Sequence, residues 1–245
     1  EGAGLDRAEE GRQPVAVTRP LVIAHRGASA VEVENSLAAF RAAGRLGADG
    51  VELGVHATAD GALVVHHDAT IAGAFIPAST AASIRSARLS NGESPPLLEE
   101  ALAAIDPRLR VYVEVKTLPP SSDAHLLAVL DGGPNPPGYA VHGFDHRILA
   151  RLGRLRPTLP RGVLSASYPL RPLVPLQDIG AEAFWQERSM VDAELASTLH
   201  GAGAQLIVWT VDDPAEMTRL ARIGADGLCT NRPDIARRTV DAVPR

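Results

Sequence analysis

Short apolar segments alternate with longer amphipathic segments along most of the chain. The apolar segments are rich in Val, Ile and Leu, and several of them, such as LVIA, RVYVEV and QLIVWTV, are apolar on both faces of a strand. Strands of this kind are typical of a parallel sheet covered by helices. The pattern predicts strands over 21–25, 50–56, 62–66, 110–116, 138–143, 161–166, 181–185, 205–210 and 226–230.

The segments between these strands repeat their apolar residues at helical spacing. In the first of them Leu37 and Phe40 share one face, Asn35 or Ser36 is a suitable N-cap, and Gly47 is a suitable stop. The same reasoning predicts helices over 36–46, 97–105, 123–131, 146–155, 191–202, 214–223 and 233–242. The Pro- and Ser-rich stretch 71–96 is predicted as a loop excursion with one short helix near 79–87.

Regular alternation of strands and helices without a sharp linker predicts one α/β domain over residues 20–245, a single closed (β/α)8 TIM barrel. The strand at 62–66 exceeds the eight that a barrel needs. We expect it as a hairpin addition, so that a small strand/loop insertion follows the second barrel strand. Residues 1–19 are polar and are predicted to form an N-terminal arm.

Composition narrows the function classes. The net charge is −5, with no run of Lys or Arg, and only 4% of residues are aromatic, which argues against a nucleic-acid partner. No stretch is predicted to be a membrane span. Cys229 is the single cysteine, so no intrachain disulfide is expected. These features favour a cytoplasmic location. An exported or membrane-associated form stays open as an alternative, because the chain begins without Met and the native N-terminus is not visible.

Polar residues gather where predicted strands end, which is where barrel enzymes have their active sites. His25 and His67 follow neighbouring strands, and two imidazoles can act as general base and general acid near neutral pH. Glu52 and Glu114 lie on two further strands, and carboxylate oxygens suit Mg²⁺ or Ca²⁺. An acid, a base and a hard cation together favour the cleavage of a phosphate ester.

Two cationic residues extend this set, since Arg26 and Lys116 offer positive charge for an anion. Taken singly, each residue has a plainer explanation. A histidine at a strand end is often structural, and Glu114 and Lys116 can form an ordinary ion pair. It is the joint placement of these residues at successive strand ends that favours the functional interpretation.

Five sequence blocks span most of residues 21–234, namely IAHRGASAVEVENS, VELGVHATADGALVVHHDATI, VYVEVK, VHGFDHRILARL and VWTVDDPAEMTRLARIGADGLCTNRPD. In their residues and their order, these blocks resemble the glycerophosphodiester phosphodiesterase family. The resemblance implies a barrel enzyme that hydrolyses a small-molecule glycerophosphodiester to glycerol 3-phosphate and an alcohol, with a divalent cation, Mg²⁺ or Ca²⁺. One histidine would deprotonate the attacking oxygen, either the glycerol 2-hydroxyl or a water, and the other would protonate the leaving alcohol.

The resemblance also implies a role for individual residues. His67, rather than His66, matches the family's second histidine because it precedes Asp68. The implied roles are catalysis by His25 and His67, phosphate or substrate contact by Arg26, Lys116 and Trp209, metal ligation by Glu52 and Glu114, and a polar pair at the start of the first helix formed by Glu34 and Asn35.

One departure from the family's pattern concerns the cation. Gly54 stands where the family usually has a metal-binding Asp, so we expect weaker cation binding, with His56 as a conceivable substitute ligand. Two alternatives to the hydrolase follow. In the first, the chain is a weakly catalytic or non-catalytic barrel that binds a phosphodiester or lipid headgroup. In the second, it is a relative that acts on lysophospholipid or sphingolipid headgroups.

Overall fold

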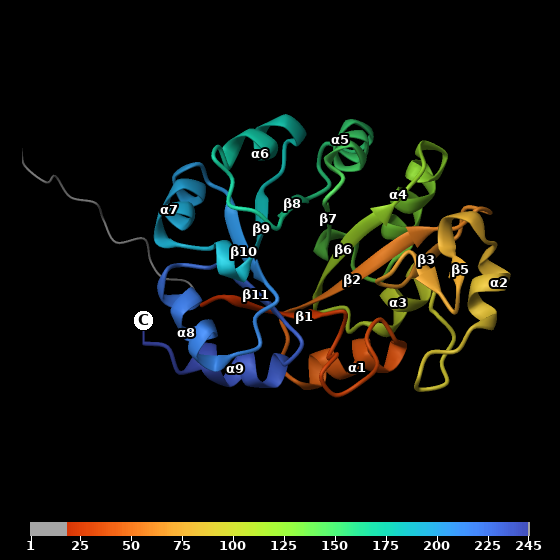
Figure 1. Ribbon diagram of the computed structural model, residues 1–245, viewed down its shortest axis with the longest axis horizontal. Helices are drawn as coiled ribbons and strands as arrows, with labels where there is room; N and C mark the ends of the chain where they lie inside the picture. The colour runs from red at the N-terminus through yellow and green to blue at the C-terminus, as the bar shows by residue number, and fades with distance from the viewer. Residues whose placement is uncertain (1–18, 245) are drawn as a thin grey trace, which may run out of the picture.

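Eight parallel strands close into a barrel in the computed structural model, which describes residues 19–244 (Figure 1). Neighbouring strands follow one another in the order β1-β11-β10-β9-β8-β7-β6-β2, and pairing of β1 with β2 closes the ring. The predicted TIM barrel is therefore confirmed. Its strands are β1 (Leu21–His25), β2 (Gly50–Ala57), β6 (Arg110–Thr117), β7 (Tyr139–Gly143), β8 (Arg161–Ser165), β9 (Ala183–Glu187), β10 (Gln205–Trp209) and β11 (Gly227–Thr230).

Helices follow the strands and form the outer layer (Figure 1). A large apolar core lies between strands and helices. The covering helices are α1 (Leu37–Arg45), α3 (Leu98–Ala104), α4 (Asp123–Gly132), α5 (His146–Leu155), α6 (Leu173–Ile179), α7 (Ala193–Gly201), α8 (Pro214–Arg222) and α9 (Pro233–Asp241). Short 3-10 helices occur at Ile76–Ala78, Pro120–Ser122, Pro136–Gly138 and Arg188–Met190.

Helix α6 was not predicted from the sequence. Its segment contains Pro172 and Pro175, which argue against a helix interior. Both prolines lie at the beginning of the helix, where backbone N–H groups have no helical partner, so neither removes a bond. Burial of Leu176 and Ile179 against the barrel stabilises the segment.

The insertion after the second barrel strand is larger than one extra strand. β3 (Leu63–Val65) pairs antiparallel with β2, close to the predicted 62–66. A hairpin of β4 (Thr70–Ile71) and β5 (Ala74–Phe75) follows, which the sequence pattern did not reveal, and then the short helix α2 (Ala81–Ser86). The insertion buries a small core of its own, made of Val64, Ile71, Ile76 and Ile84. It thereby forms a supported platform beside the carboxyl end of β2.

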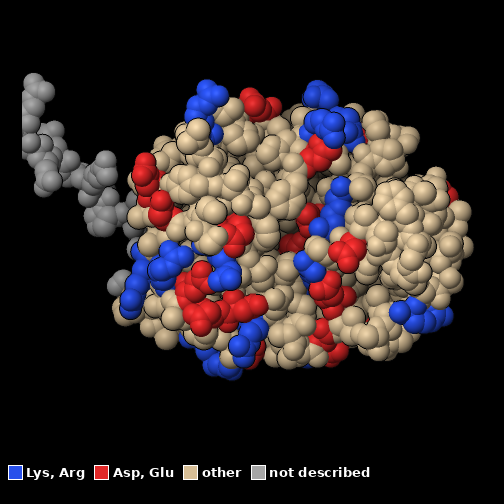
Figure 2. Space-filling model, viewed as in Figure 1, with Lys and Arg blue, Asp and Glu red and all other residues tan. Residues whose placement is uncertain are grey.

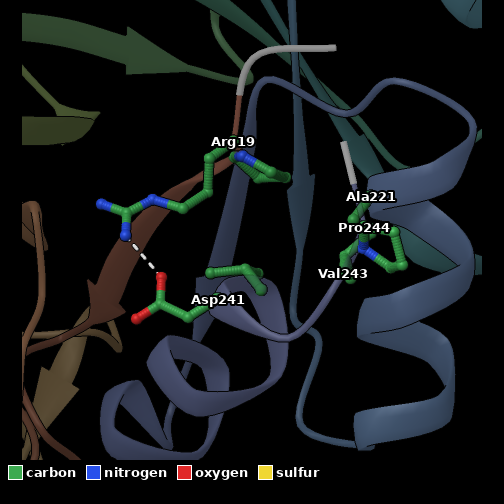
Figure 3. A pocket seen from close by; sticks show the side chains of 7 residues that line it. Arg19, Ala221, Asp241, Val243 and Pro244 are labelled. Atoms are coloured by element: carbon green, nitrogen blue, oxygen red, sulfur yellow. Dashed lines mark hydrogen bonds and ion pairs between the residues drawn. The ribbon is translucent and has the colours of Figure 1, made fainter.

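The two ends of the described chain meet close to the amino end of β1. The Arg19 guanidinium donates to the Asp241 carboxylate, at a cavity of about 210 Å³ that Val243 and Pro244 also line (Figure 3). The predicted arm 1–19 lies outside the described residues apart from Arg19. Within residues 19–244, every helix is too short or too polar to cross a bilayer. The cytoplasmic location stays a prediction.

Candidate active site

A cavity of about 70 Å³ opens at the carboxyl ends of the barrel strands. Its floor is formed by the inward-facing core that includes Leu164, Trp185 and Cys229. A larger cavity of about 260 Å³ lies at the opposite end of the barrel, but no histidine lines it. On the face drawn in Figure 2, acidic and basic side chains border a hollow near the middle. The small cavity is lined by His25, Arg26, Glu52, His67, Glu114, Lys116, His142, Phe144, Leu164, Trp185, Trp209 and Cys229.

The chain thus brings together seven of the predicted site residues and leaves three outside the cavity. The seven are His25, Arg26, Glu52, His67, Glu114, Lys116 and Trp209. The three that do not line it are Glu34, Asn35 and His56, although each contacts the loops that shape its rim.

His25 is held in one orientation by a chain of hydrogen bonds. The Asn231 amide nitrogen donates to the Asp212 carboxylate at 2.7 Å, so the Asn231 Oδ1 faces His25. This oxygen lies 2.8 Å from the His25 Nδ1 and can only accept, so Nδ1 carries the proton. Ser29 Oγ lies at the same distance from that oxygen. The His25 Nε2 therefore directs its lone pair towards the cavity, where the Glu52 Oε2 is 4.0 Å away.

The protein environment keeps His25 neutral. Burial, together with the nearby positive charge of Arg26, lowers the pKa of His25 to about 4. The hydrogen bond to Asn231 opposes this shift but is outweighed. At neutral pH the Nε2 atom is thus available to accept a proton, which is the requirement for a general base.

His67 enters the cavity from the insertion. Its Nδ1 lies 2.7 Å from the Asp68 Oδ1, and this hydrogen bond lowers the pKa of the Asp68 carboxyl. The ionised carboxylate accepts from Nδ1, which leaves the Nε2 of His67 directed away from Asp68. Its neighbour His66 does not line the cavity.

A tight turn carries Arg26 to the rim. Arg26 and Gly27 both have positive φ, at 56° and 82°, and a Cβ on Gly27 would lie 2.7 Å from the backbone carbon of Ala39. The Arg26 backbone N–H donates to Glu52 at 3.1 Å, and its guanidinium donates to both carboxylate oxygens of Glu34 at 2.9 Å. Glu34 therefore positions the guanidinium beside the cavity.

Asn35 and His56 support the loops around the cavity. The Asn35 backbone donates to the Arg26 carbonyl, and its buried side-chain amide has no partner among residues 19–244. The His56 Nδ1 lies 3.1 Å from Thr117 Oγ1, and its Nε2 lies 3.2 Å from the His67 carbonyl. Both His56 nitrogens are thus engaged behind the cavity, which leaves neither as a metal ligand in this arrangement.

Glu52 and Glu114 form an acidic pair at the bottom of the cavity. Burial and the neighbouring charge of Glu114 raise the pKa of Glu52 to about 8. Burial also opposes ionisation of Glu114, but the ammonium of Lys116, 2.6 Å from its Oε2, together with the neighbouring histidines His142 and His67, outweighs burial and lowers the pKa of Glu114. Lys116 therefore decides how charge is shared in this pair.

These donors do not fit a tightly held divalent cation. Within the described residues, no group of three or more His, Cys, Asp or Glu side chains has the arrangement of a metal site. Gly54 adds no ligand, and a Cβ placed there would lie 2.7 Å from the Lys116 Cε. The place of a third carboxylate is thus filled by a lysine side chain, and Glu114 already has a cationic partner.

Sequence reasoning missed several residues of the site. His142 lies buried below Glu52 and stacks on Trp185 with ring centroids 4.1 Å apart, and burial lowers its pKa to about 3. Phe144 packs edge-on against Trp209 and forms an apolar wall. His142 is the last residue but one of β7, and Phe144 directly follows the strand, so the same strand-end rule could have found them.

Comparison with known proteins gives consistent results. The sequence profile described as the glycerophosphoryl diester phosphodiesterase family matches residues 25–235. A glycerophosphodiester phosphodiesterase of Caldanaerobacter subterraneus subsp. tengcongensis is 31% identical over 232 residues, which are 88% of this chain and 96% of that relative. A probable glycerophosphodiester phosphodiesterase 2 of Mycobacterium tuberculosis is 30% identical over 89% of each chain.

Solved structures share the fold. A phosphodiesterase of Oleispira antarctica, in complex with the product sn-glycerol-3-phosphate, matches with a TM-score of 0.86 and 24% identity over 91% of this chain and 97% of its own. A glycerophosphodiester phosphodiesterase of Parabacteroides distasonis matches with a TM-score of 0.82 and 26% identity, over 91% and 98% of the two chains.

Proposed function

The chain belongs to the glycerophosphoryl diester phosphodiesterase family, and we propose that its cavity hydrolyses glycerophosphodiesters to glycerol 3-phosphate and an alcohol by paired-histidine acid–base catalysis. The observation that carries this proposal is that His25 and His67, from different elements, line one cavity together with cationic side chains. The product bound to the Oleispira antarctica phosphodiesterase supports the same choice of substrate.

His25 is assigned as the general base. Its Nδ1 proton is committed to Asn231, and its neutral Nε2 faces the cavity. It takes the proton of the attacking oxygen, which is either the glycerol 2-hydroxyl or a water. As that oxygen bonds to phosphorus, the bond from phosphorus to the leaving oxygen breaks. If the 2-hydroxyl attacks, water opens the resulting cyclic phosphate in a second step.

His67 is assigned as the general acid, because it is the second histidine that lines the cavity and a separate segment of the chain holds it there. It gives its proton to the leaving oxygen, so that an alcohol departs. Asp68 holds the Nδ1 of the ring and keeps Nε2 as the atom that delivers the proton.

Charge and shape complete the assignment. Arg26 and Lys116 place positive charge beside the phosphate, where negative charge develops during the reaction. Trp209 and Phe144 offer an apolar wall for the carbon skeleton of the substrate. The donors around Glu52 and Glu114 fit the Mg²⁺ or Ca²⁺ expected from the family resemblance poorly, and the proposed steps use neither ion.

A coupled assay for glycerol 3-phosphate tests the proposal, with glycerophosphocholine, glycerophosphoethanolamine and glycerophosphoglycerol as substrates. His25→Ala and His67→Ala should each lower kcat by about 10²–10⁴-fold, which is what general acid–base catalysis contributes. His66→Ala is the matched control and should retain wild-type turnover, since His66 does not line the cavity. Substrate binding without any product release would instead favour a barrel that only binds phosphodiesters.

A further inference from the structure

Lys116 is the only lysine in the sequence, since the 24 basic residues comprise 23 arginines and this single lysine. It lies in the catalytic cavity, with a side chain that is 15% exposed. The two side chains differ in ways that matter at such a position. Arginine presents a wide planar fork, whereas lysine presents a compact ammonium on a slender stem. The cavity therefore holds the only lysine ammonium of the chain, a compact positive charge that a narrow site can accommodate.

The path of the Lys116 stem depends on Gly54. A Cβ built on Gly54 would lie 2.7 Å from the Lys116 Cε and 3.4 Å from its Cδ. Any side chain at position 54 would thus displace the lysine. The glycine on β2 and the lysine on β6 form a complementary pair, in which the missing side chain of one makes room for the other.

The acidic pair of Glu52 and Glu114 explains why a cation is needed at this position. Glu52 and Glu114 are both buried in the same cavity, and a buried carboxylate needs a compensating positive charge. The Lys116 ammonium supplies one at 2.6 Å from the Glu114 Oε2, and this carboxylate is only 12% exposed. The Arg26 guanidinium, in contrast, points to Glu34 at the rim. Within residues 19–244, and apart from histidines, Lys116 is the only cationic side chain that forms an ion pair with Glu52 or Glu114.

We propose that the Lys116 ammonium is a built-in cation of the catalytic cavity, so that phosphodiester hydrolysis by this chain needs no divalent metal ion. The inference rests on the proposed function and deepens it. During the reaction the ammonium offsets the negative charge that develops on the non-bridging phosphate oxygens. Lys116 donates hydrogen bonds to them and neither gains nor loses a proton overall.

The first test compares turnover in EDTA with turnover in added MgCl₂ or CaCl₂. The wild-type enzyme should release glycerol 3-phosphate at the same rate in each buffer. Lys116→Met should lose about 10²–10³-fold in kcat, as expected when one charge-stabilising donor is removed. Arg41→Met, at an exposed position on α1, is the control for loss of a positive charge. A wild-type enzyme that is inactive in EDTA and recovers with either ion overturns the inference and leaves the proposed function intact.

The second test does not depend on activity. Calorimetry of the wild-type protein should show no stoichiometric binding of Mg²⁺ or Ca²⁺. The double variant Gly54→Asp/Lys116→Ala, which removes the internal cation and adds a third carboxylate, should gain it. Nitrogen-15 lysine labelling of the wild-type chain gives a single backbone amide signal, from Lys116, which should not move when either ion is added. A saturable shift of that signal, or wild-type binding that Glu114→Gln abolishes, overturns the inference even if the double variant does not fold.

The two proposals fail in different ways. A chain that turns over no glycerophosphodiester in any buffer contradicts the proposed function. The calorimetric and spectroscopic results still decide whether Lys116 or a metal ion neutralises the acidic pair.

Discussion

The two sides of the catalytic cavity hold their histidines by contrasting means. His25, at the end of β1, is 16% exposed and is fixed by Asn231, which lies 206 residues away in sequence on the loop after β11. His67 is 37% exposed and is held by its sequence neighbour Asp68, whose side chain is 70% exposed. The proposed base thus belongs to the closed barrel, whereas the proposed acid belongs to an insertion at its edge.

This difference follows from the topology. Pairing of β1 with β11 closes the barrel and brings the first and last strands together, so the orientation of His25 depends on completion of the whole ring. The insertion rests on β2, on the neighbouring helix α3 and on its own small core, and takes no part in closing the ring. We therefore expect substitutions on the His25 side to cost more in stability and in rate than comparable substitutions on the His67 side.

The largest effect is expected for Gly27→Ala. Positive φ costs a non-glycine residue about 1–2 kcal/mol, and contact of the new Cβ with the Ala39 backbone adds roughly 1–3 kcal/mol. Gly61→Ala, on the insertion side, is the matched control, because Gly61 has a φ of 85° and nothing within 4 Å of its Cβ position. Urea unfolding should show the larger loss for Gly27→Ala, and equal losses would contradict the contrast between the two sides.

A smaller effect is expected for Asn231→Ala. Loss of the amide leaves the His25 ring without the acceptor that fixes its tautomer, and removal of such an orienting partner typically costs about 10–100-fold in activity. The measured quantity is kcat in the glycerol 3-phosphate assay. Asp68→Ala provides the comparison and should cost less than about fivefold, because an exposed ion pair contributes less than roughly 1 kcal/mol. The reverse order of the two losses would show that the exposed support matters more.

The barrel itself could be predicted from the sequence because burial on both faces leaves a simple apolar pattern. Exceptions arose where a polar residue is buried within a strand. Strand β9 continues through Gln186 to Glu187, whereas the prediction based on apolar runs ended at residue 185, two residues too early. Gln186 is polar but fully buried, and its side chain donates to the Ser165 carbonyl. The hairpin of β4 and β5 has only two residues in each strand, too few for any periodicity.

The candidate site was predictable only as far as strand ends identify it. Residues that point into the cavity from those ends, such as His67 and Lys116, follow from strand position. Asp212 and Asn231 act through another side chain, and nothing in their spacing reveals which histidine they orient. The fit of the Lys116 side chain against Gly54 likewise depends on the register between β2 and β6, which neither segment reveals by itself.

The pH dependence of kcat/KM tests the central claim, that His25 is a general base kept neutral by the barrel. A base whose pKa is lowered to about 4 is active above that pH and is lost by protonation below it. We therefore expect no decline of kcat/KM as the pH is lowered from 7 to 5, and a fall only as the pH passes through about 4. A decline centred near the ordinary histidine value of about 6.5 would contradict the account.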